Sequence, residues 1–161
     1  GELYYHRRYE EAKENYEVFL ESEDGWLENQ IEACRHLADC YHHMGQEKQE
    51  LQALFYSLSL DIPRAEICCD IGRCFFDKKK YPIAVFWYKQ AANTKRRDER
   101  GGFVLLDCYD YIPYLQLCVC YDRLGDYKAA QMYNEMAGKV RPDSKTYLAN
   151  REYFLRRLGV H

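Results

Sequence analysis

The chain has 161 residues, of which 47% are hydrophobic and 30% charged, and its net charge is −3. This is the size of one ordinary domain. The hydrophobic content is high enough to form a core, which excludes a chain that is disordered because its hydrophobicity is low. The charge lacks the basic excess of a nucleic-acid-binding surface. No apolar run is long enough to span a bilayer, and the polar N-terminal residues are unlike a signal peptide. Aromatic residues are frequent, with 16 Tyr, 7 Phe and 2 Trp.

A pattern of small, aromatic and turn residues recurs along the chain. Ala38-x2-Tyr41-x3-Gly45 is followed 34 residues later by Gly72-x2-Phe75, and Cys118-x2-Tyr121-x3-Gly125 repeats it after one further period and an insertion. This pattern resembles the tetratricopeptide repeat (TPR), in which each unit is a pair of antiparallel helices. The small residues allow the helices to approach closely, and the aromatic side chains fill the space beside them. The resemblance predicts an all-α TPR solenoid with a right-handed superhelix.

The repeat register and the local stop signals predict the element boundaries. First helices should end near Gly45, Lys79 and Gly125, with glycine relieving the left-handed strain of a helix stop, and Pro82 should open a second helix. Pro63 and Pro142 should end second helices. Ser144 or Asp143 should cap the last helix. Within a single TPR domain, 1–161, we expect the second helix of a truncated repeat at 1–25, repeats at 26–63, 64–96 and 111–142, an insert at 97–110, and a capping helix at 143–161. A truncated first repeat implies a longer parent chain.

The residues that carry chemistry do not form a recognisable catalytic or cofactor motif. All 8 Cys lie in apolar, helix-like stretches, so we expect free buried thiols in a reducing cytoplasm rather than disulfides. His36, Cys40 and His43 share one helix face by their spacing, but we expect packing or surface roles there rather than a metal site. Phosphate-binding, zinc-protease and serine-hydrolase motifs are missing. The sequence therefore predicts no enzyme activity, no cofactor and no metal.

Four stretches resemble a more specific family. They begin at Pro63 (PRAEICCDIGR), Ala84 (AVFWYKQA), Gly102 (GFVLLDCY) and Ile112 (IPYLQLCVCYDRLGDY). Together they look like the TPR tail of bacterial family 2 glycosyltransferases, with the sharpest match between Ala65 and Gly138. The resemblance implies a parent enzyme that transfers a sugar from a nucleotide donor. The Asp-x-Asp motif of that family does not occur in this chain, so no catalytic residue is carried over.

In TPR folds the first helices line a concave groove, and the register predicts which side chains face it. We expect Glu32, Glu66, Cys69, Ile112, Leu115 and Val119 at outward positions. Phe76 also lies at an outward position and is the strongest single candidate for contact, because an outward aromatic has no packing role in the repeat. The alternative is that Phe76 only covers the adjacent repeat. The groove residues that we expect to bind are Arg35, Asp39, His42, His43, Arg73, Phe76, Asp77, Asp122 and Arg123.

The acidic residues of this predicted groove argue against the capture of an anionic peptide terminus. We therefore predict a scaffold that binds a polypeptide partner, the acceptor protein, or the catalytic domain of a parent glycosyltransferase. The alternatives are a free-standing TPR adaptor without an attached enzyme and a carbohydrate-binding groove built from stacked aromatics. The sequence predicts no nucleic-acid partner and no membrane span, and it leaves the oligomeric state open.

Overall fold

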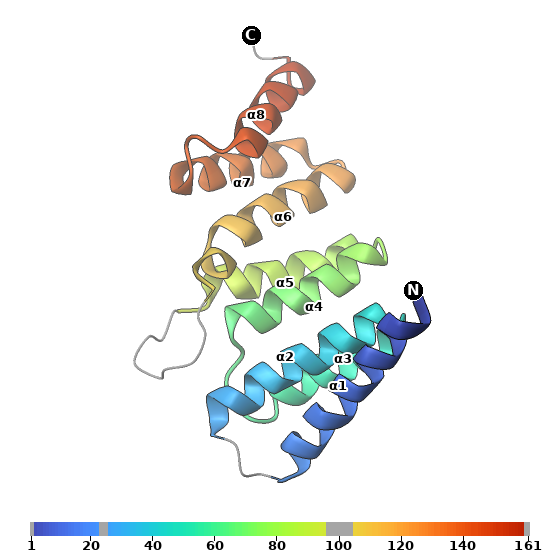
Figure 1. The fold of residues 1–161 in the computed structure, drawn as a ribbon. Helices are drawn as coiled ribbons and strands as arrows, with labels where there is room; N and C mark the ends of the chain where they lie inside the picture. Colours follow the sequence, from blue (N-terminus) through green and yellow to red (C-terminus); the bar gives the residue numbers. More distant parts are fainter. Residues whose placement is uncertain (1, 23–25, 96–104, 160–161) are drawn as a thin grey trace. The chain divides into compact units, whose positions relative to one another are not determined.

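The computed structural model describes residues 2–22, 26–95 and 105–159, and every regular element in these ranges is a helix (Figure 1). The prediction of an all-α fold is therefore confirmed for the described residues. None of these helices is long and apolar enough to cross a membrane. In chain order the helices are α1 (Glu2–Ser22), α2 (Leu27–His43), α3 (Glu47–Ser57), α4 (Ala65–Asp77), α5 (Tyr81–Asn93), the short 3-10 helix η2 (Leu106–Tyr109), α6 (Tyr111–Arg123), α7 (Tyr127–Val140) and α8 (Lys145–Arg157).

The helices fall in two compact units, α1–α3 and α4–α8. In the first unit α1 packs against α2, and α2 packs against α3. Apolar residues recur along α2 at helical spacing, so this helix has one buried side and one polar side. The polar side carries the four groove residues that the sequence analysis assigned to this helix, Arg35, Asp39, His42 and His43. The buried side of α2 consists of Ile31, Ala33, Cys34, Leu37, Ala38 and Cys40.

In the second unit α4 pairs with α5, α6 pairs with α7, and α8 packs against α7. The buried core between α4 and α5 alternates small residues with rings, as the repeat pattern predicts. Ala84 and Ala91 are fully buried in the same core as Tyr88. A Cβ atom added to Gly72 would lie 3.0 Å from the Tyr88 ring, so the absence of a side chain at Gly72 lets this ring pack against α4.

The turns between paired helices follow the predicted signals. Gly45 and Gly125 have positive φ angles of 71° and 81°, and Lys79 adopts the same left-handed backbone with φ 59°. Pro82 lies in the first turn of α5. Ser144 is the cap of α8, because its Oγ accepts a hydrogen bond from the Tyr147 N–H at 3.2 Å. These local signals agree with the observed helix ends. Pro63 does not end α3, because that helix already ends at Ser57.

The predicted insert at 97–110 is described only in part, because residues 97–104 lie outside the described ranges. Residues 106–109 form η2, which packs against α4, α5 and α6. Cys108 of η2 is buried. The apolar end of the insert is therefore part of the packed second unit.

Candidate functional site

The polar side of α2 places three of the predicted groove residues at the surface of the first unit. The side chains of His42 and His43 are each 43% exposed and that of Asp39 is 64% exposed. The Arg35 side chain is only 18% exposed, and its guanidinium lies 3.8 Å from the Glu32 carboxylate. The predicted positions thus share one helix side in the structure, which presents both charged and imidazole groups.

Each histidine of this side lies beside a carboxylate. His36 Nε2 is 3.2 Å from Glu32, and His43 Nε2 is 3.4 Å from Asp39. His42 Nδ1 is 3.4 Å from Glu50 on α3. These contacts become ion pairs only when the imidazole is protonated. The pair of His43 and Asp39 is exposed, and such pairs contribute about 0–1 kcal/mol, whereas the Glu50 carboxylate beside His42 is buried. Their main consequence is to orient the side chains.

The imidazoles also contact tyrosine rings of α1. The rings of His43 and Tyr9 stack with centroids 4.5 Å apart and an interplanar angle of 9°. The rings of His36 and Tyr16 meet at 5.3 Å in a tilted arrangement. The sequence analysis gave His36 and His43 no role toward the segment 1–25. Tyr9 and Tyr16 lie two turns apart on one face of α1, and this spacing is the sequence signal from which the contacts could have been predicted.

A cleft of about 220 Å³ opens between α1 and α2 beside these contacts. It is lined by Arg8, Tyr9, Ala12, Tyr16, His36, Asp39 and Cys40. Sequence reasoning identified Asp39 but not the cleft, because the cleft depends on how α1 docks on α2. Within the described ranges no three His, Cys, Asp or Glu side chains are grouped so that they could hold a metal ion.

In the second unit the predicted residues of α4 divide into two groups. The side chains of Arg73 and Asp77 are 38% and 50% exposed and form an ion pair at 3.0 Å, one turn apart. Phe76 is half-buried and meets the Tyr81 ring edge-on at 5.5 Å, so the expectation that it has no packing role is wrong. These contacts show that Phe76 packs within the second unit, whereas its role in binding stays a prediction.

Two further positions of α4 are not outward at all, which corrects the predicted groove. Glu66 is buried, and its carboxylate accepts hydrogen bonds from the Leu105 N–H at 3.0 Å and the Tyr109 hydroxyl at 3.1 Å. Cys69 is also buried, and its thiol donates to the Cys108 carbonyl at 3.5 Å. Residues 105–109 therefore cover this part of α4. Burial and the nearby Glu66 carboxylate raise the pKa of Tyr109, which keeps the phenol protonated as a donor.

The predicted residues of α6 also have partners in the second unit. Asp122 accepts a hydrogen bond from the Tyr153 hydroxyl of α8 at 2.8 Å. Arg123, in the last turn of α6, is exposed. Ile112, Leu115 and Val119 are half-buried. The α6 side thus offers mainly apolar and partly covered groups, in contrast to the charged side of α2.

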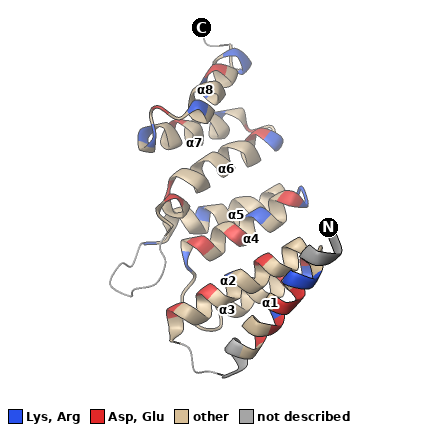
Figure 2. Cartoon of the chain, viewed as in Figure 1, with Lys and Arg blue, Asp and Glu red and all other residues tan. Residues whose placement is uncertain are grey.

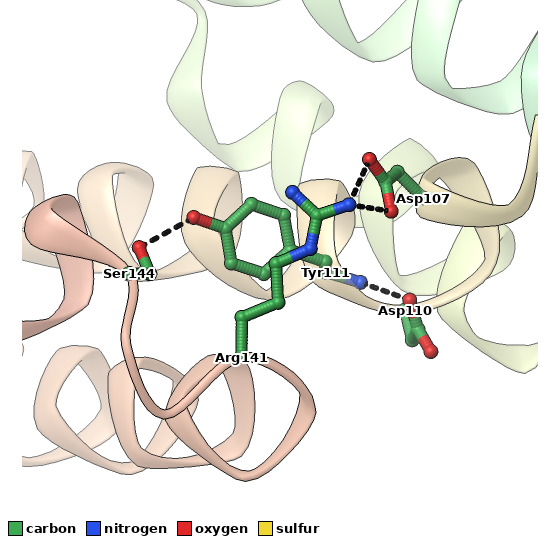
Figure 3. A network of polar contacts seen from close by, with 5 residues as sticks. All are labelled: Asp107, Asp110, Tyr111, Arg141 and Ser144. Atoms are coloured by element: carbon green, nitrogen blue, oxygen red, sulfur yellow. Dashed lines mark hydrogen bonds and ion pairs between the residues drawn. The ribbon is translucent and has the colours of Figure 1, made fainter.

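A polar network at the other end of α6 joins η2 to the connection between α7 and α8. The Arg141 guanidinium lies 4.4 Å from the centroid of the Tyr111 ring and donates to both carboxylate oxygens of Asp107 (Figure 3). The Tyr111 and Ser144 hydroxyls are 2.6 Å apart. Asp110 accepts a hydrogen bond from the Tyr111 N–H. This network is a structural clasp rather than an open site, because its groups bind one another.

All 8 cysteines are free and buried, as the sequence predicts. Burial raises the pKa of Cys34 to about 11 and that of Cys68 and Cys120 to about 12. The thiolate is the nucleophilic form of cysteine, so these thiols are poor nucleophiles near neutral pH.

Comparison with known proteins gives a likeness in fold. No family model matches the chain. No curated protein matches it either. Among solved structures, a crystal structure of MamA superposes with a TM-score of 0.73 at 18% identity, covering 94% of this chain and 80% of that one. A MamA structure from AMB-1 gives 0.65 at 19% identity, with 99% and 84% covered. PilF of Pseudomonas aeruginosa gives 0.59 at 18% identity, with 94% and 62% covered.

MamA and PilF are TPR solenoid proteins. The chain has the TPR solenoid fold. This agrees with the 34-residue pattern in its sequence and with its paired helices. The TPR prediction is therefore confirmed as a fold. A likeness to solved structures below 25% identity shows a common fold and nothing more. These comparisons do not show the glycosyltransferase resemblance.

Proposed function

We propose that the chain is a non-catalytic protein-interaction module, with repeats at 26–63, 64–96 and 111–142, that binds a polypeptide through the outward sides of their first helices. TPR solenoids present such extended surfaces to partners. The observation that carries the proposal is the polar side of α2, where Asp39, His42 and His43 are exposed and oriented by neighbouring groups. Exposed charged and ring-bearing side chains held in place are suited to recognising a partner.

A free-standing adaptor is the form of this proposal that needs no further assumption. The buried free thiols fit a reducing compartment such as the cytoplasm. The partner is then a separate protein. Its contacts would include Asp39 in the first unit and, independently, Arg73 and Arg123 in the second unit.

Charge reversal on the proposed surface tests the adaptor function. Asp39→Lys and Arg73→Glu should each weaken capture of the partner from the source cells after chemical cross-linking, because they invert the charge of an exposed side chain. Matched controls are Glu14→Lys on α1 and Lys128→Glu on α7, which invert exposed charges away from the first helices. Equal capture by all four variants, with unchanged circular dichroism, would place binding on another surface.

The second candidate is that the chain is the TPR tail of a bacterial family 2-like glycosyltransferase that uses a nucleotide-sugar donor. The four sequence stretches between Pro63 and Tyr127 support it. In that case the polypeptide bound is the acceptor protein or the catalytic domain of the same chain. The genomic sequence upstream of Gly1 distinguishes the two candidates: a nucleotide-sugar domain with an Asp-x-Asp motif favours the enzyme, and its absence from the reading frame favours the adaptor.

A further inference from the structure

The cleft between α1 and α2, called the slot below, is small and open to solvent, and residues of both helices line it. Tyr9, Ala12 and Tyr16 lie on one face of α1 at helical spacing, so the two rings form walls and the alanine leaves the space between them. His36, Asp39 and Cys40 close the slot from α2. Its volume of about 220 Å³ is below the range of about 300–1,000 Å³ that is typical of sites for drug-sized molecules and cofactors.

Contacts outside the slot fix its walls before anything binds. Tyr9 stacks on His43, and His43 lies against Asp39. Farther along α1, the Tyr41 hydroxyl of α2 donates to Glu17 at 2.7 Å and fixes the two helices to each other. A preformed slot costs little conformational entropy on binding.

The charges at the rim come from opposite helices. Arg8 of α1 is exposed and makes no hydrogen bond or ion pair with any residue that the structure describes. Asp39 of α2 faces the same slot but already lies beside His43. Among the described groups at the rim, Arg8 is therefore the charged one without a partner, and a guanidinium pairs best with a carboxylate. Both charge signs are visible along α1 in Figure 2.

We propose that this slot is an anchoring subsite that takes one aromatic side chain of a bound polypeptide, while Arg8 pairs with an acidic residue beside that side chain. The inference rests on the proposed polypeptide-binding function and assigns it a recognition chemistry. Two tyrosine rings and an imidazole favour an aromatic occupant, because aromatic rings prefer edge-to-face or offset contacts with other rings. The carboxylate of Asp39, on the opposite rim, can accept a hydrogen bond from the peptide main chain.

Three blocked tetrapeptides test this chemistry on the whole chain. The probes are acetyl-Gly-Asp-Phe-Gly-amide, its Ala analogue in place of Phe, and its Lys analogue in place of Asp. Titrations followed by amide chemical shifts should move signals of residues 8–16 and 36–40 with the Asp-Phe probe. The Ala probe should bind about tenfold more weakly, since it leaves the slot empty, and the Lys probe should also bind more weakly.

Two variants, each with a matched control, test whether the Asp-Phe probe binds in the slot and pairs with Arg8. Ala12→Leu fills the slot and should abolish binding of the Asp-Phe probe, whereas Asn15→Leu adds the same side chain at an exposed position of α1 and should not. Arg8→Ala should remove the preference for Asp over Lys, whereas Arg7→Ala should keep it. If Ala12→Leu disturbs the structure of α1, the comparison of Arg8→Ala with Arg7→Ala still tests the proposal. No shifts at the slot, equal binding of the Phe and Ala probes, or a preference for Asp that survives in Arg8→Ala would overturn the proposal.

The outcome can be separated from that of the proposed function. If the natural partner is captured equally by wild type and Ala12→Leu but lost in Asp39→Lys, the module function stands and the anchoring subsite is refuted. If the Asp-Phe probe binds as described while no substitution on the first helices affects partner capture, the subsite stands and the proposed groove function fails.

Discussion

Single residues decide how closely the helices of the second unit can approach each other. Gly138 of α7 is buried, and a Cβ atom placed on it would lie 2.2 Å from the Tyr147 ring of α8. The main chain of Tyr147 is held by the Asn134 side-chain amide, which donates to its carbonyl at 3.1 Å. The glycine and the ring are therefore complementary, and the ring has little freedom to move aside.

We expect Gly138→Ala to lower the free energy of unfolding by about 1–3 kcal/mol, because the new methyl group must displace the Tyr147 ring. Urea denaturation measures the change. Gly72→Ala is the graded comparison: its methyl group would lie 3.0 Å from Tyr88 and should cost less. A Gly138→Ala protein as stable as wild type would show that α8 packs differently.

Buried thiols should make the fold sensitive to alkaline pH. Burial raises the pKa of Cys68, Cys118 and Cys120 to about 12, whereas the unfolded chain loses these protons near the ordinary thiol pKa. Their contribution to stability is thus complete below a pH of about 9 and is lost as the pH rises toward about 12. Under reducing conditions the melting temperature should fall across this window. A constant or rising melting temperature there would contradict the burial of these thiols.

At the scale of elements, the ends of helices could be predicted from the sequence. Gly45, Gly125 and Ser144 act locally, through their own backbone or the next turn, so their neighbours in the chain are enough to identify them. The burial of Glu66 could not be predicted in this way, because its hydrogen-bond donors lie 39 and 43 residues later. The cleft between α1 and α2 could not be predicted either, because it depends on how these two helices dock on each other. Helical periodicity gives the face of each helix but not the segment that covers it.

The turn after α4 uses a lysine where the corresponding turns use glycine. Lys79 has a φ of 59°, a left-handed backbone that costs a residue with a Cβ atom about 1–2 kcal/mol. Lys79→Gly should therefore raise the free energy of unfolding, by up to about 1 kcal/mol after the greater flexibility of glycine in the unfolded chain is allowed for. Thermal denaturation checks this, with Lys80→Gly as the control at the adjacent position. A loss of stability in Lys79→Gly would show that its side chain has a packing role.

The clasp between η2 and the α7–α8 connection has a similar test. Arg141→Ala removes the contact with Tyr111 and the ion pair with Asp107, and we expect a loss of about 1 kcal/mol, since both ion-pair partners are partly exposed. Arg141→Lys should recover only part of it, because an ammonium cannot reproduce the flat guanidinium contact. A double-mutant cycle with Asp107→Ala measures the coupling. Zero coupling would mean that the clasp contributes nothing to stability.

At the scale of the whole molecule, the repeat period predicted the fold, while the binding surface depends on tertiary detail. The 34-residue spacing fixes the helix pairs, and solved structures at 18% identity share the fold. Asp39, His42 and Asp77 are exposed, as the predicted groove requires, whereas Glu66 and Cys69 are buried beneath residues 105–109. The binding role of the exposed residues stays a prediction. A partner's identity is encoded in side-chain detail that the repeat pattern leaves free to vary.

Site-specific photo-cross-linking in the source cells tests the central claim, binding of a polypeptide by the first-helix sides, most directly. A photoreactive amino acid is placed at position 39 on α2 and, in a matched chain, at the exposed position 14 on α1. We expect a discrete cross-linked polypeptide from position 39 that is absent from position 14 and is lost when unlabelled wild-type chain competes. Identical products from both positions, or none from position 39 in a folded protein, would contradict the claim.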